Sequence, residues 1–396
     1  MKCNIFLCSC LVFLLLTACN AQTVEDTDKN EAIPKEQSEV WEVTDISGNK
    51  SMLDVSNVEE MGQRVEMDYA NDPSDYGQVY NGHYYYMSCE NKLYTIYMDH
   101  GTKIGSFRCS DIFDLEECVK YGDEFYVIYS SRVGIIDFEK QKIRRLFNLT
   151  TDFGKVFDVS ICQNQIFITE LTAFRETYST DFQGNLIKSF KTPQVSEEYK
   201  DWYGPGNPKG IDEKNLYYSI EDPERKRVQI LYVNQNTGKM GKVFEYTRDS
   251  RFESQRFIGI VKCDDMVYIE ERLKDDLYCL YIIDKTSKKM QTVASSIMDW
   301  TISEKYVFYK DKRRRIHRWD KENGEDKVIS KIKAYDINCV GAELYVTEYN
   351  GYFEDDDEDI EDDEDYTKDD YYAEIEAGRM NIYTMDFEGK NIRKVN

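Results

Sequence analysis

The stretch GQVYNGHYYYMSCENKLYTIYMDHGTKIGSF, from Gly77 to Phe107, decides the fold class of this chain. It divides into four short runs rich in aromatic and β-branched residues, at 78–80, 84–87, 93–98 and 103–107. Each run is bounded by Gly, Asn or Asp, which favour turns, and residues of this kind favour strands over helices. The stretch therefore predicts four short strands joined by tight turns.

The same pattern returns at an even period. Its aromatic second run recurs at 124–128, 165–168, 216–219, 266–269, 306–309 and 343–346. Its third run recurs, with a closing Asp or Asn, at 134–137, 230–234, 280–284, 318–320 and 382–386. With one 28-residue insertion (351–378) set aside, this makes seven units of about 42 residues, a period typical of β-propellers.

We therefore predict an all-β fold, a seven-bladed β-propeller of four-stranded blades, over residues 75–396. A lone sheet with apolar residues on both faces cannot bury them, whereas sheets packed face to face around an axis can. An open β-solenoid or two sandwiches are the alternatives.

The N-terminal residues predict a targeting signal. Lys2 precedes an apolar run at 5–16, which suits a signal peptide and is too short to span a bilayer. The tetrad Leu16-Thr17-Ala18-Cys19 resembles a bacterial lipobox, whose cysteine becomes the acylated N-terminus. The resemblance implies a lipoprotein signal peptide at 1–18 and lipid attachment at Cys19, which would hold the protein on the cell membrane, facing away from the cytoplasm. The alternative is a plain secretory signal or a short anchor.

Two segments separate this signal from the repeats. Residues 19–39 are polar and charged without an apolar period, which predicts a flexible tether. Residues 40–74 regain some strand character, and we expect an extended segment that pairs with the propeller edge or caps it.

The repeats resemble a known propeller family. Turns such as Leu93–Gly101 and Asn381–Gly389, each after an aromatic strand such as Tyr84–Ser88, resemble the YWTD-type repeat of low-density-lipoprotein-receptor relatives. The closer resemblance is to its degenerate bacterial version, found in lipoproteins of Gram-positive gut anaerobes and largely of unknown function. No unit reproduces the YWTD tetrad. The resemblance covers about 75–396, implies a propeller with an extracytoplasmic binding role, and supplies no catalytic residues.

An aromatic loop is the first candidate binding element. The segment Thr192–Gly210 holds three of the chain's six prolines and presents Tyr199, Trp202 and Tyr203. Aromatic rings on a stiff loop suit stacking against sugars or peptide side chains. Alternatively, these rings plug the channel mouth or cover the seam between two blades.

An acidic insertion is the second candidate. Residues 354–376 contain fifteen acids and one base, about −14 of the chain's net charge of −24. Such runs are most often solvated loops, but this one could bind calcium loosely or capture a cationic partner. Specific calcium chelation is weakly supported, because no glycine stands where an EF-hand loop needs one. The weak candidate ligands are Asp355, Asp357 and Asp359.

A basic run is the third candidate. Lys312-Arg313-Arg314-Arg315 is predicted at the turn between strands two and three of the sixth unit, on the face that also carries the connections between blades. We therefore name Arg313, Arg314 and Arg315 as candidate ligand-binding residues. The acidic insertion of the next blade could also fold onto them as a soft, salt-sensitive latch.

Residues for catalysis are sparse. His83, His100 and His317 fall in different units, and no HExxH, CxxC or GxSxG motif accompanies them, so a zinc site or a hydrolytic triad is not predicted. Cys162, Cys263 and Cys339 stand at equivalent repeat positions, which indicates small buried hydrophobes rather than disulfides. The strong negative charge argues against nucleic-acid binding.

These observations predict a binding protein. We expect a non-catalytic module for an envelope protein, peptide or glycan, without a cofactor. The alternatives are a glycan lyase or hydrolase that uses carboxylates at the central channel, and a purely structural envelope component. An enzyme should gather carboxylates, histidine or arginine with perturbed pKa values at the channel mouth.

Overall fold

The chain divides into two units, Met1–Pro34 and Lys35–Asn396, and every described residue belongs to the second. The computed structural model describes residues 40–44, 50–54, 61, 64–65, 77–90, 93–109, 115–129, 132–148, 155–162, 164–171, 177–190, 208–222, 227–247, 256–263, 265–274, 277–284, 289–348 and 381–395. The expected signal peptide, the tether at 19–39 and the insertion at 351–378 lie outside these residues.

The described residues form strands and turns, which confirms the all-β prediction. They are arranged in successive antiparallel meanders, each a set of neighbouring strands that follow one another in sequence. The strands before 200 that belong to meanders are β4 (Gly77–Tyr80), β5 (His83–Glu90), β6 (Leu93–Met98), β7 (Thr102–Arg108), β8 (Leu115–Tyr121), β9 (Glu124–Tyr129), β10 (Arg132–Asp137), β11 (Lys142–Asn148), β12 (Lys155–Cys162), β13 (Gln165–Leu171), β14 (Thr177–Thr180) and β15 (Leu186–Phe190).

The C-terminal half continues in the same way. Its strands are β16 (Gly210–Ile211), β17 (Asn215–Asp222), β18 (Arg227–Asn234), β19 (Met240–Thr247), β20 (Arg256–Cys263), β21 (Met266–Lys274), β22 (Leu277–Asp284), β23 (Lys289–Ile302), β24 (Tyr306–Asp311), β25 (Ile316–Asp320), β26 (Asp326–Ser330), β27 (Ala334–Val340), β28 (Glu343–Glu348), β29 (Ile382–Asp386) and β30 (Arg393–Lys394). The long β23 pairs with β22 through its first part and with β24 through its second, so it serves two meanders.

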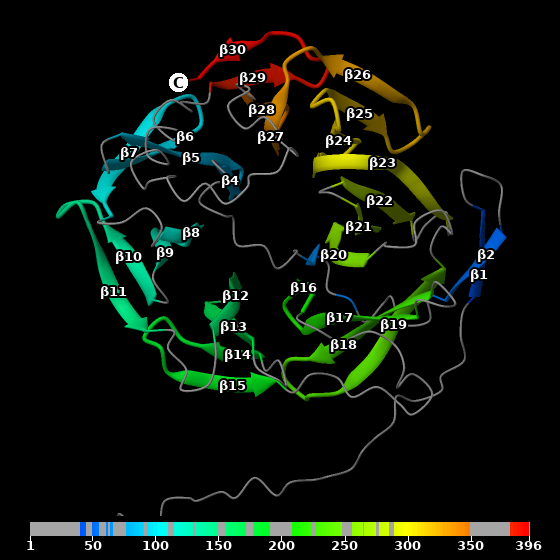
Figure 1. Cartoon of the computed structure of the whole chain (residues 1–396), viewed down its shortest axis with the longest axis horizontal. Helices are drawn as coiled ribbons and strands as arrows, with labels where there is room; N and C mark the ends of the chain where they lie inside the picture. The colour runs from blue at the N-terminus through cyan, green and yellow to red at the C-terminus, as the bar shows by residue number, and fades with distance from the viewer. Residues whose placement is uncertain are drawn as a thin grey trace, which may run out of the picture. The chain divides into compact units, whose positions relative to one another are not determined.

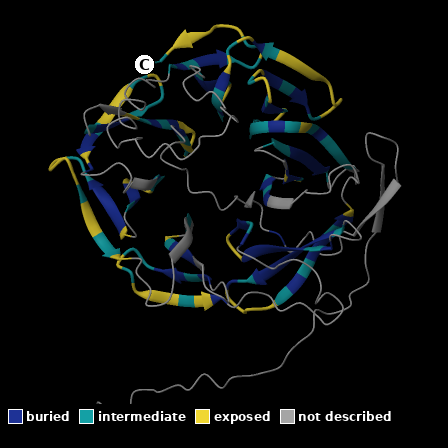
Figure 2. Cartoon of the chain, viewed as in Figure 1, coloured by how far each residue is buried: buried dark blue, intermediate teal, exposed yellow. Residues whose placement is uncertain are grey.

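The meanders follow one another around a common centre, with β4, β8, β12, β16 and β20 innermost (Figure 1). Their middle strands are buried on both faces, as in β9 and β10, where four consecutive residues are buried. Outer strands such as β11 and β26 are largely exposed (Figure 2). This burial explains why the sequence shows continuous apolar runs where a half-exposed strand would alternate.

The core lies between neighbouring meanders. Apolar clusters join β6 to β9, β9 to β13, β18 to β21, β22 to β24 and β24 to β28. The last meander meets the first through Tyr84, Tyr86, Tyr345 and Ile382, with Tyr84 and Tyr345 ring centroids 4.6 Å apart. Of the described strands, none forms a backbone ladder across this seam. Side-chain packing therefore closes the ring.

In five of the described third strands, the Asp or Asn that ends or follows the strand caps a turn. Asp386 Oδ1 accepts the backbone N–H groups of Glu388 and Lys390, at 3.0 and 2.8 Å. Asp137, Asp181, Asn234 and Asp320 make equivalent bonds in their own turns. The repeat motif thus has a structural role, because a side-chain acceptor satisfies turn N–H groups that no strand pairs.

The innermost strands are sheet edges, and neighbouring side chains satisfy some of their free N–H groups. Gln78 Oε1 accepts Lys120 N–H (2.7 Å), and Asp299 Oδ2 accepts Ile337 N–H (3.0 Å), each from the next meander. Two of the repeat cysteines, Cys263 and Cys339, pack against apolar clusters, as the sequence predicts.

The segment before the repeats pairs with two edges. β1 (Val40–Thr44) and β2 (Lys50–Asp54) form a hairpin, and Asp54 pairs with Glu245 of the outer strand β19. β3 (Arg64–Val65) pairs with the inner strand β20. Between them Met61 is buried in the cluster that joins β18 to β21. The sequence left edge pairing or capping open; within the described residues this segment pairs with edges.

Candidate functional site

The predicted site residues fall into two groups. Cys19, the aromatic candidates Tyr199, Trp202 and Tyr203, and the possible metal ligands Asp355, Asp357 and Asp359 lie outside the described residues. Arg313, Arg314 and Arg315 are described, in the turn between β24 and β25 where the sequence places them.

This turn is held by one carboxylate. Asp311 Oδ1 accepts the backbone N–H groups of Arg313 and Arg315, at 2.9 and 2.8 Å, and Asp311 Oδ2 accepts Arg315 Nε–H at 2.8 Å. Arg314 adopts a left-handed conformation (φ 61°), which lets its N–H reach Asp311 O at 2.7 Å. The backbone of the turn is therefore fixed, while Lys312, Arg313 and Arg315 remain exposed.

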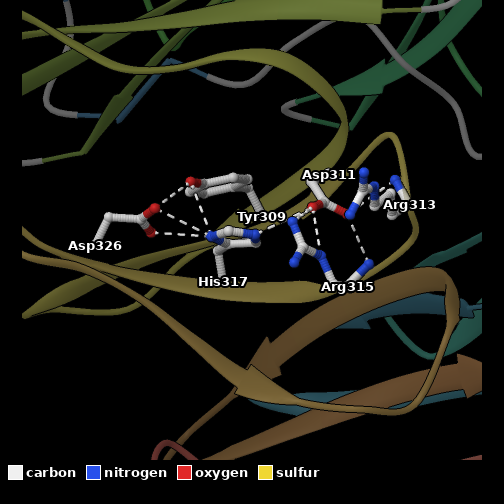
Figure 3. A network of polar contacts seen from close by, with 6 residues as sticks. All are labelled: Tyr309, Asp311, Arg313, Arg315, His317 and Asp326. Carbon is white, nitrogen blue, oxygen red and sulfur yellow. Dashed lines mark hydrogen bonds and ion pairs between the residues drawn. The ribbon is translucent and has the colours of Figure 1, made fainter.

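His317 lies beneath the turn, stacked on Tyr309 with ring centroids 4.6 Å apart (Figure 3). Its Nε2 is 3.3 Å from Asp311 Oδ2, and its Nδ1 is 3.1 Å from Asp326 Oδ2. Tyr309 OH donates to Asp326 Oδ2 at 2.8 Å. One nearly buried imidazole thus joins two carboxylates, one of which organises the basic turn.

The protonation equilibria follow from these contacts. Burial alone would lower the pKa of His317, but hydrogen bonds and charge from Asp326 and Asp311 outweigh it and raise that pKa above 6.5. Burial likewise works to raise the pKa of Asp311, yet the hydrogen bonds from Arg315 and His317 hold it below its usual value. The pKa of Asp326 is lowered by His317 and Tyr309 despite burial.

A second basic segment lies against the turn. Ala334 N–H, at the start of β27, donates to Arg314 O at 2.8 Å, and this places the connection at 331–333 beside the turn. That connection exposes Lys331 and Lys333. The result confirms that turns between second and third strands share a face with connections between meanders, here for β24–β25. We call Lys312, Arg313, Arg314, Arg315, Lys331 and Lys333 the basic cluster.

A buried acid, Glu270, lies elsewhere, on β21 and near Asp299 and Trp300 of β23. Glu270 is 7% exposed and pairs in register with Gly259. Burial raises its pKa to about 7, against a hydrogen bond from Trp300 that lowers it, and Asp299 adds a further rise. Both carboxylate oxygens of Asp299 accept hydrogen bonds, from the backbone N–H groups of Trp300 (2.6 Å) and Ile337 (3.0 Å).

Glu270→Gln is expected to change the pH dependence of stability. The folded state keeps the Glu270 proton up to pH about 7, whereas the ordinary pKa is 4.5, so the wild type loses stability as pH rises from 4.5 through 7. Because Gln is neutral throughout, the stability of the variant relative to the wild type should rise by about 3 kcal/mol over that range.

Urea unfolding at pH 4.5 and pH 8 measures this change. The exposed Glu304, changed to Gln, is the control and should show no such rise. A pH-independent difference between wild type and Glu270→Gln would show that Glu270 ionises normally.

The described part of the chain has neither a metal-binding side-chain cluster nor a membrane-spanning helix. There, no group of three or more His, Cys, Asp or Glu side chains could hold a metal ion. Nor do these residues include a helix long and apolar enough to cross a membrane.

Sequence comparison finds no matching family model and no matching curated protein. Among solved structures, the puromycin hydrolase S511A mutant complexed with PGG matches 86% of this chain at 8% identity, with a TM-score of 0.51. Together with the antiparallel meanders around a common centre, this similarity decides the fold. The chain is a β-propeller. It spans 55% of the length of that hydrolase, and the similarity shows the fold alone.

Other propeller matches are more distant. The computationally designed Ika8 protein matches 80% of this chain and 85% of its own length, with 8% identity and a TM-score of 0.44. Virginiamycin B lyase from Staphylococcus aureus matches 71% of this chain and 94% of its own length, with 13% identity and a TM-score of 0.43.

The sequence missed the partners of the basic turn. The sequence alone shows His317 as one of three scattered histidines, yet the hairpin register places it opposite Tyr309. Counting back from the turn in the predicted hairpin would have paired these two residues. Asp326, in β26, and the buried state of Glu270 leave no comparable signal in one sequence.

Proposed function

We propose that this chain is a non-catalytic binding module of the cell envelope, a seven-bladed propeller of four-stranded blades held at the membrane by lipid on Cys19. The repeat count in the sequence and the succession of meanders support seven blades. The lipobox resemblance supports the anchor. The ligand is an envelope protein, peptide or glycan that carries negative charge.

The basic cluster carries this proposal. Six cations from two hydrogen-bonded segments meet there, and the same segments, 311–315 and 331–333, contribute one acid, Asp311. In a chain with a net charge of −24, this is a local reversal of sign. Like charges gathered within about 10 Å act together on an approaching anion, since the Debye length is about that in 0.1 M salt.

The turn is also prepared for binding. Its backbone is already fixed by Asp311, so an anion does not have to order it, and less free energy is lost on association. Exposed guanidinium groups bind carboxylate or phosphate in a bidentate manner. Arg315 is partly occupied by Asp311, which leaves Lys312 and Arg313 as the main contacts for a ligand.

The double variant Lys312→Ala, Arg313→Ala tests the proposal. We expect it to bind poly-L-glutamate or polyphosphate about tenfold more weakly at low salt, because two exposed ion pairs contribute up to about 1 kcal/mol each. Calorimetry or fluorescence anisotropy measures the affinity, and wild-type binding should weaken as salt rises.

The matched control removes two exposed lysines from the opposite end of another blade, Lys214→Ala and Lys239→Ala. These lie in the turns β16–β17 and β18–β19, which alternate with the second-to-third turn in an antiparallel meander. Equal loss in both double variants would show that only net charge matters, and the proposed surface would then be wrong.

A glycan-active lyase or hydrolase is the second candidate, and Glu270 is the observation that favours it. In glycosidases, one carboxyl group with a raised pKa acts as the proton donor, and a neighbouring carboxylate plays the second role. Buried Glu270, with its raised pKa, and the hydrogen-bonded Asp299 resemble such a pair. Reducing-end release from envelope glycans, lost in Glu270→Gln, would favour this candidate. Absence of release by the wild type would favour the binding module.

A further inference from the structure

We infer that His317 makes anion binding by the basic cluster depend on pH, with tighter binding when the imidazole is protonated. This inference rests on the proposed function, since it concerns the same surface. His317 shares Asp311 Oδ2 with Arg315, so the imidazole and an arginine of the cluster compete for one carboxylate oxygen. The charge of His317 therefore acts directly on the basic turn (Figure 3).

The hydrogen bonds fix which proton is lost. Tyr309 OH donates to Asp326 Oδ2, so it does not also donate to His317 Nδ1, and Nδ1 must donate to the hydroxyl or the carboxylate beside it. A neutral imidazole has one N–H, which this requirement places on Nδ1. Nε2 then carries a proton only in the imidazolium, where it donates to Asp311.

Deprotonation has two effects on the cluster. It removes one positive charge from beneath the turn, and it leaves Asp311 with Arg315 as its only cationic partner among the contacts described. The set formed by Asp311, Asp326, Arg315 and His317 then changes from neutral to −1. Both effects reduce the positive potential that an anion meets at Lys312 and Arg313.

The groups that face His317 come from three sides. Tyr309 and Asp311 belong to β24 and Asp326 to β26, while Arg315, in the turn, reaches the same Asp311 oxygen as His317. The two carboxylates favour the imidazolium, and they outweigh burial, so the pKa of His317 lies above 6.5. The proton is therefore retained at pH 6.5 and lost at higher pH, and affinity is expected to fall as pH rises through that pKa.

Dextran sulfate is the probe, because its sulfate charges do not change between pH 6 and 9. The wild type should lose about two- to threefold in affinity across this range, as expected for one charge removed several ångströms away. His317→Gln should give a flat profile. The exposed His83, changed to Gln, is the control and should keep the wild-type profile.

Asp326→Asn gives a second test that does not rely on replacing the histidine. With one carboxylate neutralised, the midpoint of the affinity profile should move to lower pH. NMR titration of His317 should also show its pKa rising when dextran sulfate is bound, since linkage is reciprocal.

The outcomes separate the two proposals. Equal pH profiles for wild type and His317→Gln, with binding intact, overturn the role of His317 and leave the binding surface standing. An unshifted His317 pKa on addition of dextran sulfate has the same meaning. No binding by the wild type at any pH overturns the anion-binding surface itself.

Discussion

Tyr84→Ala is expected to lower the free energy of unfolding by about 3–5 kcal/mol, the usual cost of truncating a large buried aromatic side chain. Tyr84 is fully buried at the seam between the last and first blades, and it contacts Tyr86 and Tyr345. Because the described strands form no backbone ladder across this seam, a cavity there weakens the aromatic packing that joins the last blade to the first.

Urea unfolding followed by tryptophan fluorescence measures this loss. Tyr84→Phe is the matched control, since it keeps the ring and should retain most of the stability. A loss below about 1 kcal/mol in Tyr84→Ala would mean that the seam tolerates the cavity and that closure depends on other contacts.

Gly389→Ala is expected to destabilise the protein by about 3 kcal/mol or more. Gly389 has a left-handed backbone (φ 71°), which costs about 1–2 kcal/mol for a residue with a side chain. An added Cβ would also lie 1.8 Å from Ile329 O, a backbone atom of the preceding blade, so the two blades would have to separate.

Gly238→Ala provides the control for this change. Gly238 has nearly the same conformation (φ 70°), but nothing lies within 4 Å of its added Cβ. Its loss of stability should therefore report the backbone conformation alone, and the difference between the two variants reports the clash. Equal losses would contradict the close approach of the β29–β30 turn to β26.

Much of the propeller could be predicted because its repeats are local. The strand expected at Leu93–Met98 has these bounds in the structure, and the basic run occupies the turn that the repeat assigns to it. Aromatic runs between turn residues are buried on both faces here, so composition and spacing were sufficient signals.

The site was only partly predictable, because its contacts are not local. The repeat locates Arg313, but a single sequence does not show that β26 brings Asp326 to His317, or that β27 brings Lys331 and Lys333 to the turn. The environment of Glu270 is hidden for the same reason, since Trp300 comes from the neighbouring blade. Registers within a hairpin can be counted, whereas contacts between blades depend on packing.

The tyrosine seam also sets a condition on synthesis. Tyr84 emerges from the ribosome roughly 260 residues before its partner Tyr345, a delay on the order of 10 to 50 seconds at usual rates of translation. During that time the first blade can form its own hairpins, but Tyr84 and Tyr86 lack the residues of the last blade against which they pack. The nascent chain must therefore keep this exposed aromatic surface from non-native association until the last blade has been synthesised.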